Sequence, residues 1–389
     1  MTYPLRSETA YEAIPIIDID THFAEPPDLW AKRAPARFRE TAPRVKRKAD
    51  GVDAWFVGDD DLEMGPLGYC VIRPDGSKQP GTLSLDTLEE LHPGATHAAP
   101  RLAVMDQHGI DVQILYPNIL GFAGDKIMEV KDEALRLFCI TAYNDACAEL
   151  KAEGGGRLLP QFLLPFWDMD LAVKEMDRCF DQLGLNGFVI PSAPEMYGLP
   201  NLSRSWWNPL LARAQERGAP INFHIGGGGV RAPYWRGMNQ VEGIVLVSTL
   251  AHLGNLVCVA NLICSGLLDR FPSLNFVSVE SGLGWLPFLL ELMEYQFDEN
   301  GSGRLKLRPR EYFQRQIYAS FWFESDVAGA VAKLGSDNIM FETDFPHPTC
   351  LYPSIQDHIA TALGPLAPDI QRKLLFENAA RVYGIELPA

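Results

Sequence analysis

The chain has 389 residues, of which 47% are apolar, and this is enough material for a large core in one or two domains. Its formal net charge of −16 repels nucleic acid and anionic membrane surfaces, so we expect neither as a partner. We find no apolar run of the roughly 20 residues that a membrane span needs, and no secretory signal at the start. Seven dispersed cysteines argue against a disulfide framework, which favours a soluble, cytoplasmic protein.

Eight apolar segments recur along the chain, and helical patterns fill nearly every gap between them. Most are continuous rather than alternating, which is typical of strands buried on both faces of a parallel sheet. The alternation predicts a (β/α)₈ TIM barrel. A doubly wound open sheet is the alternative, but no GxGxxG follows the first strand. The predicted strands are 14–20, 111–117, 158–165, 186–192, 220–226, 274–281, 317–323 and 338–345.

Residues 31–100 break this rhythm. The stretches "RVKRKADGVDAWFVGDDDLEMG" and "CVIRPDGSKQPG" predict short hairpins around DG and PDG turns. We interpret the segment as an insertion after the first strand, at the C-terminal mouth of the barrel where such loops build active sites. Residues 1–389 are then one domain with an elaborated rim.

Polar side chains gather at the predicted strand ends. Asp20 and His22 end the first strand and share one face because strand side chains alternate. His224, Glu280 and Asp344 end the fifth, sixth and eighth strands. Carboxylates and imidazoles converging on one barrel mouth are a donor set for Zn²⁺ or a similar divalent ion. Taken singly, each residue is equally compatible with a helix cap or a satisfied core position.

Several motifs together resemble those of the amidohydrolase-related family, which includes aminocarboxymuconate-semialdehyde decarboxylase and the resorcylate-type decarboxylases. They are "DIDTHFAEPPDLW", "RLAVMDQHGIDVQILYP", "INFHIGGG", "LICSGLLDRFPSLNFVSVESGLGWLPF" and "ETDFPHP", in the family's order. The resemblance runs from about residue 14 to the C-terminus. It implies a (β/α)₈ barrel with one divalent metal, most often zinc, with manganese as the alternative.

The resemblance also implies the metal ligands. The family's first-strand HxH or ExH motif falls on Asp20 and His22, and its later ligands fall on His224 and Asp344. The sequence departs from the family at the sixth strand, where Glu280 stands in place of a histidine.

The residues suggest roles in a reaction. Asp344 beside a bound water can act as a general base, and a buried Glu280 kept neutral can donate a proton. His252 is a candidate to replace the missing imidazole, with a helix-surface position as its other interpretation. His347, in "DFPHP", fits an outer contact better than a ligand.

The glycine-rich stretch "GGGGVRAPYWRGMNQ" is a candidate substrate loop. Arg231 or Arg236 can clamp a carboxylate, and Trp30 and Tyr234 are candidate aromatic contacts for a carboxylated ring or polyene. The alternative interpretation is that the two arginines are exposed at the surface and that the aromatic residues only pack against their neighbours.

Three functions stay open. The family resemblance favours a decarboxylase of an aromatic or unsaturated acid. Glu280 favours a hydrolase or hydratase with a metal-activated water, and loss of the histidine leaves room for a non-catalytic ligand-binding barrel. The run "WLPFLLELMEYQF" (285–297) is apolar on more than one helix face, so we expect a homodimer.

Overall fold

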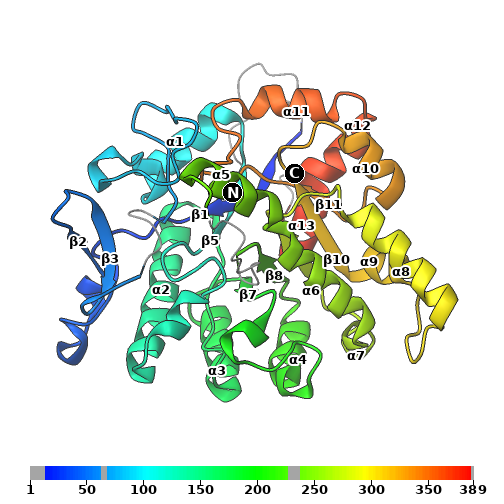
Figure 1. Cartoon of the computed structure of the whole chain (residues 1–389), viewed down its shortest axis with the longest axis horizontal. Coiled ribbons are helices and arrows are strands. Elements are labelled where there is room, and N and C mark those ends of the chain that lie inside the picture. The colour runs from blue at the N-terminus through cyan, green and yellow to red at the C-terminus, as the bar shows by residue number, and fades with distance from the viewer. Residues whose placement is uncertain (1–13, 63–67, 227–236, 387–389) are drawn as a thin grey trace.

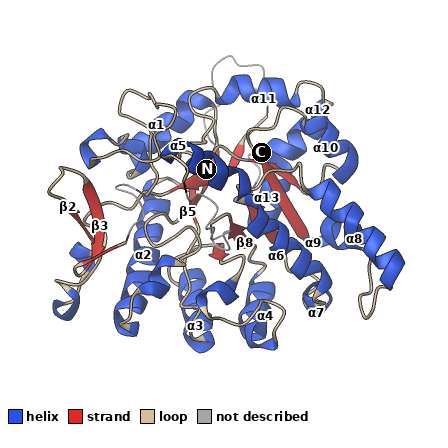
Figure 2. Cartoon of the chain, viewed as in Figure 1, coloured by secondary structure: helices blue, strands red, loops and turns tan. Residues whose placement is uncertain are grey.

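The computed structural model describes residues 14–62, 68–226 and 237–386. Parallel strands form the centre of the molecule, and helices lie around them on the outside (Figures 1 and 2). The chain is therefore of the α/β class, as the alternating segments predict.

The central strands form two parallel sheets. One has the order β1-β5-β6, and the other has the order β11-β10-β9-β8-β7. Isolated parallel bridges, Thr21 with Phe345 and Phe162 with Phe188, connect the two sheets at both of their edges. All eight predicted strands are present, at β1 (Ile17–His22), β5 (Val112–Tyr116), β6 (Leu158–Pro160), β7 (Phe188–Ile190), β8 (Ile221–His224), β9 (Phe276–Val279), β10 (Ile317–Phe321) and β11 (Ile339–Phe341).

Several helices begin or end at residues that commonly cap helices. The Asp132 carboxylate accepts hydrogen bonds from the backbone N–H groups of Ala134 and Leu135 at the start of α2, and Gly218 in the left-handed region ends α4. The helices are α1 (Ala98–His108), α2 (Glu133–Glu153), α3 (Met169–Asp181), α4 (Asn208–Arg217), α5 (Gln240–Leu250), α6 (His252–Cys264), α7 (Leu267–Arg270), α8 (Leu286–Asn300), α9 (Pro309–Gln316), α10 (Val327–Leu334), α11 (Ile355–Leu363), α12 (Pro368–Arg372) and α13 (Asn378–Tyr383).

Residues 44–61 form a small antiparallel sheet beside the central strands (Figure 1, blue). It consists of β2 (Arg44–Arg47), β3 (Asp53–Val57) and β4 (Asp60–Asp61). The hairpin predicted at the first DG turn is thus present. The PDG segment makes a tight turn, with the Gly76 N–H donating to the Arg73 carbonyl, but residues 68–81 contain no assigned strand. The Val71 N–H donates to the Pro346 carbonyl, so this segment lies against the chain that follows β11.

The expectation that no apolar segment is long enough to span a membrane is wrong. Val241–Cys264, which covers nearly all of α5 and α6, meets the length and composition of a span, and only 22% of the 18-residue window that meets the hydropathy criterion is buried. Small and polar residues interrupt this stretch, so it contains no long unbroken apolar run. Length and composition alone do not establish a membrane span, and most described residues of this stretch are at least partly exposed.

Candidate metal centre

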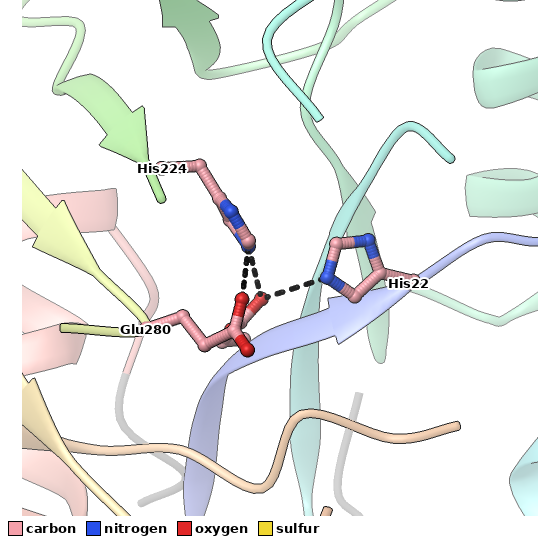
Figure 3. Close-up of side chains that lie close together, drawn as sticks. His22, His224 and Glu280 are labelled. Carbon is pink, nitrogen blue, oxygen red and sulfur yellow. Dashed lines mark ion pairs between the residues drawn. The ribbon is translucent and has the colours of Figure 1, made fainter. Parts of the chain in front are cut away.

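The ends of the parallel strands bring five side chains together. Asp20 and His22 lie on β1, His224 ends β8, Glu280 follows β9 and Asp344 follows β11. All five are buried, and only Glu280 retains measurable exposure, at 7%. Figure 3 shows the two imidazole rings and the Glu280 carboxylate pointing toward one another. The parallel arrangement thus gathers residues that are up to 324 positions apart at one place.

The interatomic distances fit metal ligation. His224 Nε2 lies 3.4 Å from Asp20 Oδ1 and 3.5 Å from Glu280 Oε2. His22 Nε2 lies 3.6 Å from Asp20 Oδ1 and 3.7 Å from Asp344 Oδ1. One ligand atom each from Asp20, His22, His224 and Glu280 lies within 4.8 Å of all the others. The structure therefore adds Glu280 to the predicted group, while Asp344 forms a second group with His22 and His347.

The backbone orients both imidazoles. Nδ1 of His22 lies 3.3 Å from the Pro117 carbonyl oxygen, and Nδ1 of His224 lies 2.9 Å from that of Ile225. A carbonyl only accepts, so each Nδ1 carries the proton and each Nε2 presents its lone pair to the carboxylates.

Several of these ligand atoms have no hydrogen-bond partner among the described residues: both Asp20 carboxylate oxygens, Nε2 of His22 and of His224, Glu280 Oε2 and Asp344 Oδ1. Lone pairs facing one another at this depth are costly unless a proton or a cation lies between them. Two imidazoles and two carboxylates are a suitable set for a divalent ion. The residues present therefore fit the metal that the strand-end pattern predicts.

The electrostatics agree with this. Burial raises the pKa of Asp20 and of Glu280 well above the usual range, and repulsion from Asp344 adds to both shifts. Burial lowers the pKa of His22 far below its usual range and that of His224 to about 4. These shifts favour neutral imidazoles and protonated carboxyl groups in the protein without metal, and a bound cation opposes the shift of the carboxyl groups.

Two of the acids stand on strained backbone. Glu280 has φ 52° and Asp344 has φ 61°, in the left-handed region that side chains other than glycine rarely adopt. The Asp344 N–H donates to the Asp20 carbonyl at 2.9 Å, and the Thr349 hydroxyl donates to Asp344 Oδ2 at 2.7 Å. These bonds leave Asp344 Oδ1 directed at the histidines.

Aromatic rings pack against the two histidines, and only one of these rings could be anticipated from a motif. The His347 ring stacks on His22 with centroids 3.8 Å apart. The Phe122 ring lies 4.7 Å from His22 and 5.0 Å from His224. The closeness of His347 to the site could be anticipated, because it follows Asp344 by three residues. Phe122 lies in a loop after β5, and no motif marks it.

A second acid on β1 also escaped the sequence analysis. Asp18 Oδ1 accepts from the Thr343 N–H at 2.9 Å and Asp18 Oδ2 accepts from the Thr343 hydroxyl at 2.6 Å. Gln113 Nε2 donates to the same carboxylate at 3.1 Å. Burial raises the pKa of Asp18 to about 7. Asp18 therefore ties β1 to the segment that carries Asp344.

Other predicted site residues lie elsewhere. His252 begins α6, with Nδ1 2.9 Å from the Thr249 carbonyl and its ring 6.5 Å from that of Trp285, and it belongs to neither ligand group. Trp30 is fully buried, and its indole N–H donates to the Cys139 carbonyl, so it packs in the core instead of lining the site. Arg231, Tyr234 and Arg236 lie outside the described residues.

Comparison with known proteins identifies relatives of this chain. The chain is 26% identical over 268 residues to gamma-resorcylate decarboxylase of Rhizobium sp. (strain MTP-10005), covering 63% of this chain and 76% of the relative. It is 24% identical over 200 residues to 2-keto-4-carboxy-3-hexenedioate hydratase of Sphingobium sp. (strain NBRC 103272 / SYK-6), covering 50% and 53%.

Solved structures share the fold. An amidohydrolase from Mycobacterium avium subsp. paratuberculosis K-10 superposes with a TM-score of 0.75 at 22% identity, covering 95% of this chain and 99% of that one. A dihydroxybenzoic acid decarboxylase from Polaromonas sp. JS666, with bound manganese and 2-nitroresorcinol, gives 0.62 at 18% identity, covering 96% and 97%. The sequence profile of the amidohydrolase family matches residues 17–385. The chain therefore belongs to the amidohydrolase family.

Proposed function

We propose that this protein is a metal-dependent decarboxylase of an aromatic or unsaturated carboxylic acid. The observation that carries the proposal is the group of buried ligand atoms without hydrogen-bond partners on Asp20, His22, His224 and Glu280. The names of relatives, gamma-resorcylate decarboxylase among them, support the reaction. We assign one divalent ion to these four residues, zinc first because of the imidazole and carboxylate set, with manganese as the alternative.

Asp344 has a separate role in this proposal. A bound divalent ion polarises the oxygen donors of a substrate and lowers the pKa of bound water. Decarboxylation also requires a proton at the carbon that loses carbon dioxide. His347 Nε2 lies 3.0 Å from Asn118 Oδ1 and its Nδ1 lies 3.0 Å from Asp344 Oδ1. Because the amide oxygen only accepts, Nε2 carries a proton, and Nδ1 faces the Asp344 carboxylate. This pair supplies the proton.

The surroundings suit a flat, anionic substrate. Phe122 is only half-buried, and its ring lies beside the three imidazoles of His22, His224 and His347. A ring or polyene can stack there, while its carboxylate or phenol oxygens face the cation. The metal supplies the local positive charge that a chain of net charge −16 needs to attract an anion.

Hydration or hydrolysis is the second candidate. Glu280 favours it, because a carboxylate beside the metal can take a proton from an attacking water. The hydratase among the relatives points the same way. Candidate substrates incubated in H₂¹⁸O separate the two reactions. Carbon dioxide release supports decarboxylation, and ¹⁸O in the product supports hydration or hydrolysis.

Metal content tests the centre itself. Protein purified without added metal is measured by inductively coupled plasma mass spectrometry, beside the double variant His22→Ala/His224→Ala. We expect about one zinc or manganese per chain in the wild type and almost none in the variant. A wild type that stays metal-free after incubation with either ion contradicts the proposal.

We also propose a homodimer formed through the exposed apolar faces of α5, α6 and α8. Seven side chains are about half-exposed there, and at roughly 90 Å² each they present about 600 Å², close to the ~800 Å² per partner of a stable interface. Light scattering of the wild type and of Val245→Asp/Phe288→Asp tests this, with a dimer and a monomer expected. The seven are Val241, Val245, Val247, Val257, Phe288, Leu292 and Tyr295.

The last proposal concerns the domain organisation. We propose that residues 1–389 work as one (β/α)₈ domain, with residues 31–100 forming part of the rim of the site. The contacts of residues 68–78 with the segment after β11 support this arrangement.

A further inference from the structure

The backbone of Glu280 needs support from outside its own strand. Glu280 leaves β9 with φ 52°, and Gly282 follows with φ 68°. A glutamate in this region is strained, and such a conformation persists only where neighbouring groups hold it. Here the conformation matters, because it directs the Glu280 carboxylate toward His224.

A second glutamate provides that support. Glu342 directly follows β11 and is fully buried. Its Oε2 accepts a hydrogen bond from the Glu280 N–H at 3.2 Å. The strand order β11-β10-β9 places β10 between the two residues, so no backbone ladder connects them. The Glu342 side chain therefore makes a link across β10 that the sheet itself does not make.

We propose that Glu342 is a positioning residue that holds the Glu280 backbone in the orientation needed for metal binding. The inference rests on the metal centre proposed above, and it concerns Glu280 alone among the ligands.

A role as core filler does not explain a carboxyl group at this place. Glu342 lies near Asp20 and Asp344, which repel a further negative charge. Its Oε1 makes no hydrogen bond within the described residues. An apolar side chain of similar size would fill the space without these costs. What glutamate adds is an acceptor that reaches the Glu280 N–H.

Three substitutions separate the acceptor from charge and size. Glu342→Gln keeps an oxygen at the same distance without a carboxylate. Glu342→Asp keeps the carboxylate but is one methylene too short, and Glu342→Met keeps the length without a strong acceptor. We measure the Kd for zinc and for manganese by competition with a chelator, using the full chain. We expect Gln to stay within threefold of the wild type, and Asp and Met to weaken binding about tenfold or more.

A double-mutant cycle shows whether the effect passes through Glu280. In the Glu280→Ala background, Glu342→Met should change the Kd by less than threefold. The matched control is Asn338→Ala. Asn338 lies just before β11, and the substitution removes the buried hydrogen bond that it donates to the Ile317 carbonyl at the start of β10. It should lower the melting temperature without changing the Kd.

The outcomes are distinct. Three results would each overturn the inference. The first is an unchanged metal Kd in Glu342→Met, and the second is a Kd change on Glu342→Met that is as large in the Glu280→Ala background as in the wild type. The third is a Glu342→Gln variant that binds metal as weakly as Glu342→Met. If Met does not fold, the contrast between Gln and Asp decides in the same way. A wild type that binds no metal overturns both the metal centre and this inference. Metal binding without decarboxylation refutes only the proposed reaction.

Discussion

Metal binding at this site should release protons from carboxyl groups and not from histidines. At pH 7 the His22 and His224 imidazoles are already neutral, because burial lowers both pKa values and that of His224 falls to about 4. Burial and repulsion from Asp344 raise the pKa values of Asp20 and Glu280, which favours the protonated form of both carboxyl groups in the metal-free protein. A metal must displace these protons, so lowering the pH weakens binding.

The size of the effect follows from the number of carboxyl groups. Each released proton changes the association constant tenfold per pH unit, about 1.4 kcal/mol, so release from both Asp20 and Glu280 gives about 2.7 kcal/mol per pH unit. Isothermal titration calorimetry in buffers of different ionisation enthalpy counts the protons. We expect about two in the wild type and about one in Glu280→Gln, whose amide has no proton to release.

Two results would refute this reasoning. One is a heat of binding that does not depend on the buffer at pH 7, which means that no proton leaves. The other is release that appears only near the ordinary histidine pKa of about 6.5, which means that the imidazoles are the groups that titrate.

Three further predictions follow from single contacts. Asp18→Ala leaves the Thr343 N–H and hydroxyl without their acceptor, so urea unfolding should show a loss of about 3–5 kcal/mol, and a loss under 1 kcal/mol contradicts the proposed tie. Phe122→Ala should weaken binding of benzoate-type carboxylates at unchanged metal content, because it removes the ring beside the histidines; equal affinity excludes stacking there. Cys264 is the exposed one of seven free cysteines, so one thiol should react with Ellman's reagent in the native protein and seven in denaturant; more than one native thiol argues against the fold.

The strands, and the gathering of polar side chains at their ends, were predictable for one physical reason. Strands buried on both faces are continuous apolar runs, and an acid or imidazole at the end of such a run is conspicuous. Asp20 and His22 at positions i and i+2 fall on one face by strand geometry alone. The sequence could not say which of Glu280 and Asp344 lies closer to His224, because that depends on the backbone turn after each strand.

The misses depend on contacts between distant segments. Glu342 lies within the predicted strand 338–345, yet its partner is the backbone of Glu280, 62 positions away. Trp30 follows a strand end in sequence, but the chain folds it into the core against Trp55. His252 begins a helix, and the local pattern does not say which way its ring points.

The end of the chain completes the interior beneath the ligands. Tyr383, on α13, donates its hydroxyl hydrogen to Asn222 Oδ1 at 2.7 Å, and Asn222 lies two residues before His224 on β8. The same hydroxyl is 3.4 Å from that of Tyr116. During synthesis, the strand that carries His224 emerges about 160 residues before this contact can form, which at roughly 5–20 residues per second is a delay of about 8–30 seconds. During that interval the nascent chain lacks the Tyr383 hydroxyl that bonds Asn222, so these interior polar groups lack that partner. A truncation before Tyr383 should therefore leave a product that chaperones and proteases recognise.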